Sequence, residues 1–187
     1  MLRKLQERLN DKLLAAVDDG DYQEAKKLLQ SGADVHVRDD YCICSAVSNG
    51  YSKLVNILIN HGANVSIYGN YPIRDAIIKE HDGTLGVICK TAVLNESVLQ
   101  DALRMAVAFN KVKSLKVILD YCELTDELFE RYVEQAISAR EQEMAVTLVL
   151  RSSDVKSHAS RAIEIAKYTG TTMSFMEPFL KLTSNEG

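Results

Sequence analysis

The cysteines and histidines of this 187-residue chain are the residues whose chemistry could serve a metal site or a nucleophile. Cys42 and Cys44 are separated by one residue, whereas zinc and dithiol motifs place two residues between their cysteines. Cys89 and Cys122 stand alone, so no second close pair completes a tetrahedral set of ligands. We therefore expect no metal, no cofactor and no disulfide framework, and we expect reduced thiols buried as small apolar side chains.

The four histidines are His36, His61, His81 and His158. None belongs to a recognisable serine or cysteine nucleophile motif, and we expect His36 and His158 to lie in solvated loops. The chain lacks phosphate-binding glycine loops, and the run Asp18-Asp19-Gly20-Asp21 lacks the spacing and final glutamate of a calcium loop. These features predict a protein that is not an enzyme. One alternative stays open, an enzyme whose hidden site brings His36, Cys42 and His61 together.

The composition excludes several other classes of protein. With 47% hydrophobic residues and a formal net charge of -4, the chain can bury a continuous core and is not expected to be disordered. Its basic residues alternate with apolar ones at helical spacing, which argues against a nucleic-acid partner. No apolar run approaches the roughly 20 residues of a membrane-spanning helix, and the evenly charged start is unlike a secretory signal. We expect a cytoplasmic protein with no membrane partner.

The residues that must position any site are organised by a repeat of thirty residues. We call a set of residues thirty apart a column. Alanine recurs at Ala16, Ala46, Ala76, Ala106, Ala136 and Ala166. Three places earlier stand Leu13, Ile43, Ile73, Leu103, Val133 and Ile163, and one place later stand Val17, Val47, Ile77, Val107 and Ile137, with Lys167 breaking the column. Further apolar columns begin at Ala25, Leu28 and Leu29. Such a repeat predicts a stack of similar units that share one core.

Each unit is predicted to hold two short helices. In the second unit, Ile43, Ala46 and Val47 lie at helical spacing on one face. Asn49-Gly50 predicts a helix end, and Ser52 is expected to cap the next helix. We therefore predict an all-α solenoid over residues 1–187 with a capping extension at 1–10, in which Leu2, Leu5 and Leu9 form an apolar capping face. The expected units are residues 11–40, 41–70, 71–100, 101–130, 131–160 and 161–187, the last being an atypical cap.

The pattern resembles the ankyrin repeat family. The segments Gly50-Tyr51, Leu54-Val55, Leu58-Ile59 and Gly62-Ala63-Asn64-Val65 are similar to the core of the family motif. The family's threonine and histidine are replaced in Tyr41-Cys42-Ile43-Cys44 and Tyr71-Pro72-Ile73-Arg74, and the period of thirty is shorter than the family's usual 33. Short units of this kind resemble those of large DNA viruses and some bacterial proteins, and their length implies a trimmed connection between units.

The resemblance implies that the chain binds another protein through the concave face of the stack, made of the loop tips and the exposed sides of the first helices. The residues expected there are Arg38, Asp39, Asp40, Tyr41, Ser45, Ser48, Tyr68, Asn70, Tyr71, Asp75, Ile78, Lys79, Met105 and Phe109. Tyrosine and arginine are frequent anchors of protein interfaces. The alternative for Tyr41 and Tyr71 is that they only pack the base of the connection.

By the same resemblance we expect a small cytoplasmic binding protein, acting as an inhibitor or adaptor of a host protein if it is viral or bacterial. Its partner is expected to be a protein whose identity the sequence does not give. A rival expectation is a self-assembling structural protein that uses its irregular C-terminal end for contact. The residues expected in that contact are Met173, Phe175, Met176 and Phe179.

Overall fold

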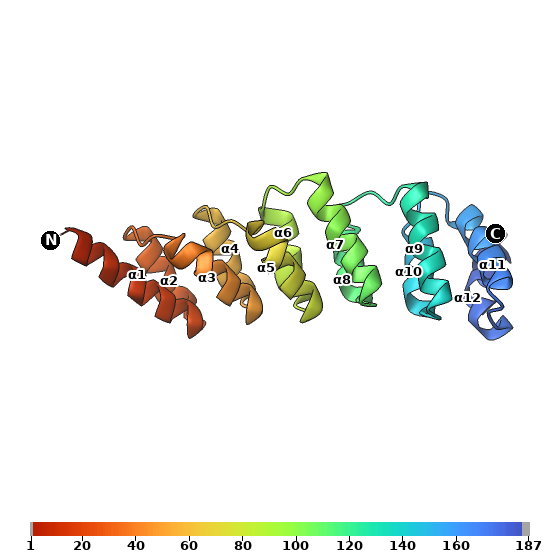
Figure 1. Ribbon diagram of the computed structural model, residues 1–187, viewed down its shortest axis with the longest axis horizontal. Coiled ribbons are helices and arrows are strands. Elements are labelled where there is room, and N and C mark those ends of the chain that lie inside the picture. The colour runs from red at the N-terminus through yellow and green to blue at the C-terminus, as the bar shows by residue number, and fades with distance from the viewer. Residues whose placement is uncertain (1, 185–187) are drawn as a thin grey trace. The chain divides into compact units, whose positions relative to one another are not determined.

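The computed structural model describes residues 2–184, and every regular element in that range is an α-helix (Figure 1). The helices follow one another in pairs joined by short turns. The first helices of the pairs are α1 (Leu2–Asp18), α3 (Val37–Ser48), α5 (Ile67–Ile78), α7 (Glu96–Ala108), α9 (Asp126–Ser138) and α11 (Val155–Tyr168). The second helices are α2 (Tyr22–Gln30), α4 (Ser52–Asn60), α6 (Asp82–Thr91), α8 (Val112–Ile118), α10 (Gln142–Leu150) and α12 (Met173–Ser184). The predicted all-α class and the helical pairs are confirmed.

The chain forms two compact units, residues 1–98 and residues 99–187. In unit 1, the first helices α1, α3 and α5 pack side by side, and so do the second helices α2, α4 and α6. In unit 2, α9 packs on α11, and α10 packs on both α8 and α12. Each unit is therefore a stack of helical pairs. That the two units continue one solenoid over residues 1–187 stays a prediction.

The alanine column lies where neighbouring first helices pack together. Ala16 is 6% exposed, and the other five alanines of the column are 2% exposed or less. A methyl group lets the helices approach closely, while the larger side chains of the flanking columns fill the space around it. The flanking column from Leu13 to Ile163 is buried throughout, whereas Lys167, which breaks its own column, is exposed. The alanine column and its two flanking columns therefore lie in the core, whereas Ile59, Cys89 and Leu119 in the column that begins at Leu29 are half-buried.

The residue two places after the end of each first helix has a left-handed backbone. Its φ is +74° at Gly20, +72° at Gly50, +60° at Glu80, +51° at Asn110, +61° at Arg140 and +68° at Gly170. This conformation reverses the chain into the second helix, and glycine adopts it without steric cost. The helix end expected at Asn49-Gly50 is confirmed.

Two local predictions are wrong. Ser52 does not cap α4, because the cap is Tyr51 and Ser52 is the first helical residue. The Oγ of Ser52 instead lies 2.9 Å from Oγ1 of the buried Thr84, so Ser52 joins α4 to α6. Residues 2–10 extend α1, but Leu5 is exposed and Leu9 only half-buried, so they do not form the expected apolar capping face. The side chain of Leu2, expected in that face, lies outside the described part.

No helix among the described residues is both long and apolar enough to span a membrane.

Candidate functional site

The cysteines are placed as structural rather than reactive groups. Burial, together with the carboxylates of Asp18 and Asp40, raises the pKa of Cys42 from 9.0 to about 12. Burial also raises the pKa of Cys89 to about 11. A thiol attacks as the thiolate, so both groups are poor nucleophiles near neutral pH. All four cysteines are free; Cys42 and Cys122 are buried as expected, whereas Cys44 and Cys89 are half-buried.

Three of the histidines have structural contacts. Nδ1 of His36 lies 2.8 Å from Oδ1 of Asp40, and Nδ1 of His61 lies 2.9 Å from the carbonyl oxygen of Ile57. Nε2 of His81 lies 3.2 Å from the carbonyl oxygen of Ser48. Among residues 2–184, no group of three or more histidine, cysteine or acidic side chains could hold a metal ion. The hidden site of His36, Cys42 and His61 therefore gains no support from these contacts.

His158 is not in a solvated loop as expected. It lies on α11, where its ring centroid is 4.0 Å from that of Phe129 on α9. Its Nε2 lies 3.5 Å from Oδ1 of Asp126. The aromatic contact holds the imidazole between the two first helices, so its role is packing.

Four of the expected binding residues meet in one groove of unit 1. The groove has a volume of about 300 Å³ and is lined by Tyr41, Cys44, Ser45, Ser48, Asn49 and Tyr71. We use the name tyrosine face for this groove together with the exposed side chains of Tyr68 and Ile78. Tyr68 is 66% exposed, and Tyr41 and Tyr71 are also exposed although they line the groove.

Hydrogen bonds between neighbouring helices hold the tyrosine face in shape. The carboxylate of Asp18, at the end of α1, accepts bonds from Tyr41 Oη at 3.1 Å and from Ser45 Oγ at 2.6 Å. Nζ of Lys79 donates to the carbonyl oxygen of Ser48 at 3.2 Å and also to the Ser48 hydroxyl. The side chains of α3 are thus fixed from both sides before any partner arrives.

The first turns of α3 and α5, where the backbone is not that of a right-handed helix, carry further expected residues. Arg38, Asp39 and Asp40 all have left-handed backbone, with φ of 52°, 53° and 59°. Tyr68, Gly69 and Asn70 repeat this turn with φ of 49°, 63° and 62°. The turn exposes Arg38, Asp39 and Tyr68 and leaves Asn70 half-buried, and Tyr68 Oη donates to the carbonyl oxygen of Asp39 at 3.3 Å.

For three residues the prediction that they lie on the surface is wrong, because the structure buries them. Asp40 and Asp75 are each 9% exposed and Met105 is 7% exposed. Oδ1 of Asp40 accepts a bond from the Asn64 backbone at 3.3 Å, so this carboxylate holds the next connection in place. Asp75 is covered by its own ion pair with Lys79, at 3.3 Å, and Met105 packs in the core of unit 2. None of the three can contact a partner in this conformation.

Phe109 is exposed as expected, but it lies in unit 2 and is not part of the tyrosine face. The C-terminal contact proposed for self-assembly is also largely wrong. Phe175, Met176 and Phe179 are buried, with the two phenylalanine rings 6.1 Å apart, and only Met173 is exposed. These aromatic side chains close the core of unit 2 and are not available to a second copy.

No family model matches this sequence, and no curated protein is significantly similar to it. Solved structures do match the fold. The crystal structure of EF0377, described as an ankyrin repeat protein, aligns with a TM-score of 0.63 over 95% of this chain and 98% of that chain. The fold is that of an ankyrin repeat protein. The two sequences are 19% identical, so the match concerns the fold alone.

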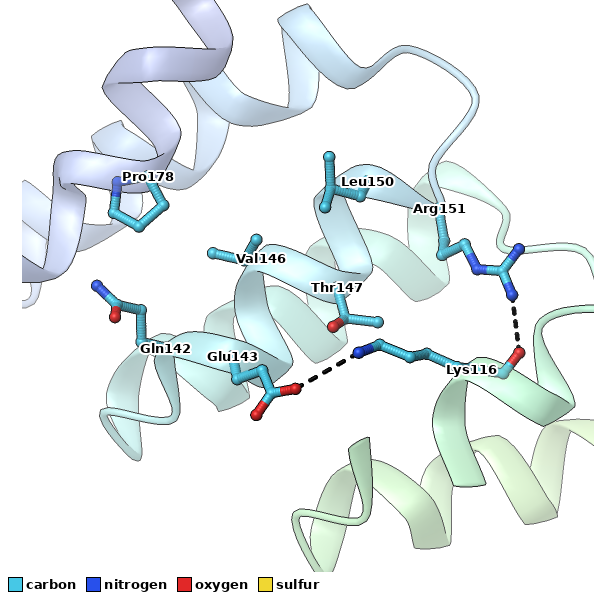
Figure 2. A pocket seen from close by; sticks show the side chains of 8 residues that line it. All are labelled: Lys116, Gln142, Glu143, Val146, Thr147, Leu150, Arg151 and Pro178. Carbon is cyan, nitrogen blue, oxygen red and sulfur yellow. Dashed lines mark hydrogen bonds and ion pairs between the residues drawn. The ribbon is translucent and has the colours of Figure 1, made fainter. Parts of the chain in front are cut away.

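The ankyrin fold of this chain has a larger groove on a face that the sequence analysis did not consider. It has a volume of about 550 Å³ and lies along the second helices of unit 2, lined by Lys116, Gln142, Glu143, Val146, Thr147, Leu150, Arg151 and Pro178 (Figure 2). Val146, Leu150 and Pro178 make an apolar floor, and Leu150 is 51% exposed. The columns carry a signal for it, since Leu150 is the first apolar residue in a column that holds Gln30, Asn60, Lys90 and Asp120 before it.

The charges at this groove are already matched within the chain. Nζ of Lys116 lies 3.4 Å from Oε1 of Glu143. Nη2 of Arg151 donates to the carbonyl oxygen of Lys116 at 2.9 Å and to the carboxylate of Asp120. The groove therefore offers apolar surface without a charge that would select a partner.

Proposed function

We propose that this chain is a non-catalytic module that binds another protein through the tyrosine face of unit 1. The observation that carries the proposal is the groove in which Tyr41, Ser45, Ser48 and Tyr71 come together from neighbouring first helices. In stacks of this kind the surface built from successive repeats is extended and its shape is fixed by the stacking. Such a surface suits a protein segment better than a small molecule.

The chemistry of the tyrosine face fits this role. Tyrosine rings supply large contact area at low entropic cost. The hydroxyls of Tyr41 and Tyr68 already donate within the chain, and their oxygens can still accept a hydrogen bond from a partner. Ser45, Ser48 and Asn49 add short polar groups along the groove. Because Asp18 and Lys79 already fix Ser45 and Ser48, little side-chain entropy is lost when a partner binds.

In its finer form, the proposal makes the chain a cytoplasmic inhibitor or adaptor of a host protein, as its resemblance to viral and bacterial short-repeat arrays implies. The free thiols fit a reducing compartment. Inhibitor and adaptor differ in one measurable respect, since only an inhibitor lowers the activity of the isolated partner when the purified chain is added.

The experiment compares proteins captured from the source cell by the wild-type chain and by three single variants. Tyr68→Ala and Tyr71→Ala change the tyrosine face, and Tyr121→Ala removes an exposed tyrosine of unit 2 as the matched control. We expect a protein that the wild type and Tyr121→Ala capture and that the two tyrosine-face variants lose. With that protein purified, each tyrosine-face variant should weaken the Kd by about fivefold or more.

Melting curves separate a lost contact from a lost fold. Tyr68 is largely exposed, so Tyr68→Ala should leave the melting temperature nearly unchanged. Identical capture by all four proteins would contradict the proposal. A strongly lowered melting temperature in Tyr68→Ala would instead contradict the assignment of Tyr68 to the surface.

A further inference from the structure

Unit 2 has its own groove on the exposed side of its first helices. The groove has a volume of about 440 Å³ and is lined by Glu130, Glu134, Arg161, Glu164, Ile165 and Tyr168. The α11 residues occupy the same columns as Tyr41, Cys44, Ser45 and Ser48, four repeats earlier in the chain. The same side of the first helices is therefore hollowed in both units, but with different chemistry.

The charges of this groove are unbalanced. Arg161 lies between two carboxylates, with Nε 3.1 Å from Oε1 of Glu130 and Nη1 3.1 Å from Oε2 of Glu164. Glu134 has no ion-pair partner within residues 2–184 and is exposed. Three carboxylates against one guanidinium leave the groove with a formal charge of -2. The neighbouring cation Lys167 does not line it.

The groove also offers surface for the apolar parts of a cationic side chain. Tyr168 is 94% exposed, so both faces of its ring are open. An aromatic face attracts an ammonium or guanidinium group through its quadrupole. Ile165 is half-buried beside it and presents apolar surface for the aliphatic part of an arginine or lysine side chain.

We propose that the α9–α11 groove binds a basic segment of a partner protein, with one arginine or lysine side chain placed between the Glu134 carboxylate and the Tyr168 ring. The excess negative charge of the α9–α11 groove complements a basic segment, and it repels nucleic acid and anionic lipid surfaces. The residues of this groove belong to unit 2 and not to the tyrosine face. The proposal names the charge of a partner segment, which the proposed function leaves open.

The test is a titration of the full chain with an acetylated, amidated Gly-Arg-Gly-Arg-Gly peptide at low ionic strength, followed by amide NMR shifts. We expect saturable shifts concentrated on α9 and α11. Glu134→Gln and Tyr168→Ala should each weaken the Kd roughly threefold, as expected for one exposed ion pair or one exposed cation–π contact. The matched controls are Glu24→Gln and Tyr121→Ala, which change a partly exposed carboxylate and an exposed ring elsewhere and should leave the Kd unchanged.

A second peptide with citrulline in place of arginine has almost the same shape and no charge. It should give no saturable shifts on α9 and α11. Equal binding of the citrulline peptide, or shifts spread over acidic surfaces of both units and unchanged by Glu134→Gln and Tyr168→Ala, would overturn the proposal. The tyrosine-face variant Tyr71→Ala should leave the titration unchanged, so this proposal and the proposed function fail independently.

Discussion

At the turns after the first helices, the residue type at the turn is related to the side chain that the next helical pair places over it. A Cβ placed on Gly20 would lie 2.9 Å from Cζ of Tyr51, and one placed on Gly50 would lie 2.9 Å from Nδ1 of His81. In both cases the ring stands 31 positions after the glycine. Three other turns have a left-handed residue that is not glycine. The position 31 places later holds Lys111 for Glu80, Glu141 for Asn110 and Thr171 for Arg140, none of which carries a ring. The two turns that a ring covers therefore hold glycine, which also stands at Gly170, where a Cβ would meet nothing within 4 Å.

Gly50→Ala should be more destabilising than Gly32→Ala. Both glycines have positive φ, at +72° and +90°, but a Cβ on Gly32 meets nothing within 4 Å. The left-handed backbone alone costs an L-residue about 1 kcal/mol, so Gly32→Ala should lower the unfolding free energy by about that amount. Gly50→Ala should cost about 2 kcal/mol or more, because the His81 ring must also move. Urea unfolding of the two variants measures the difference, and equal losses would contradict the covered-turn explanation.

Cys42 should make the stability of the chain fall in alkaline solution. Its pKa is raised from 9.0 to about 12, so the folded state keeps a proton that the unfolded state releases. The stabilisation is therefore complete below pH 9 and is lost as the pH rises from about 9 to about 12. Between pH 8 and pH 10, the wild type should lose about 1 kcal/mol more unfolding free energy than Cys42→Ala does. Parallel losses in the two proteins would show that the folded-state pKa of Cys42 is not raised.

Each helix has an apolar face that the two helices of one pair cannot bury by themselves, so it packs against helices of the neighbouring pairs. Leu54, Val55 and Leu58 of α4 are 1% exposed or less, and they are covered by α2, α3 and α6. A fully buried aliphatic side chain contributes roughly 1.5–3 kcal/mol to folding. The stack is therefore sensitive to any charge placed on these faces and tolerant of charge on the opposite side of the same helix.

Leu58→Asp should unfold unit 1, since it places an unpaired carboxylate in the core and removes a buried side chain. The expected loss is about 4 kcal/mol or more. Asn56→Asp adds the same charge on the exposed side of α4 and should change stability by no more than about 0.5 kcal/mol. Circular dichroism during urea unfolding compares the two variants. A Leu58→Asp protein that unfolds like the wild type would contradict the placement of this column in the core.

For the molecule as a whole, the repeat made the helical pairs, their core and much of the tyrosine face predictable. The buried residues Asp75 and Met105 share a column with the half-buried Ser45, and this column lies at the border between the core and the exposed side. Exposure there depends on neighbours such as Lys79, which a column does not reveal. The left-handed turn at Arg38–Asp40 was also beyond sequence reasoning, because aspartate tolerates a single positive φ but these residue types do not predict three in a row.

The grooves of unit 2 were missed for a different reason. The conspicuous run of tyrosines stands on the first helices of unit 1, while Tyr168 lies in the last, irregular repeat. Val146 and Leu150 stand in columns whose four preceding members are polar residues or glycine, and the sequence alone does not show that these positions line an exposed groove. A search for residues that depart from their column would have found these positions.

Photocrosslinking from the tyrosine face tests the central claim most directly. Benzoylphenylalanine would replace Tyr71 in one protein and Lys53, exposed on the second helix α4, in the other. On irradiation in the source cell, position 71 should form a covalent adduct with one partner protein, and position 53 should form none with it. An adduct of that partner at position 53 with none at position 71 would contradict binding through the tyrosine face.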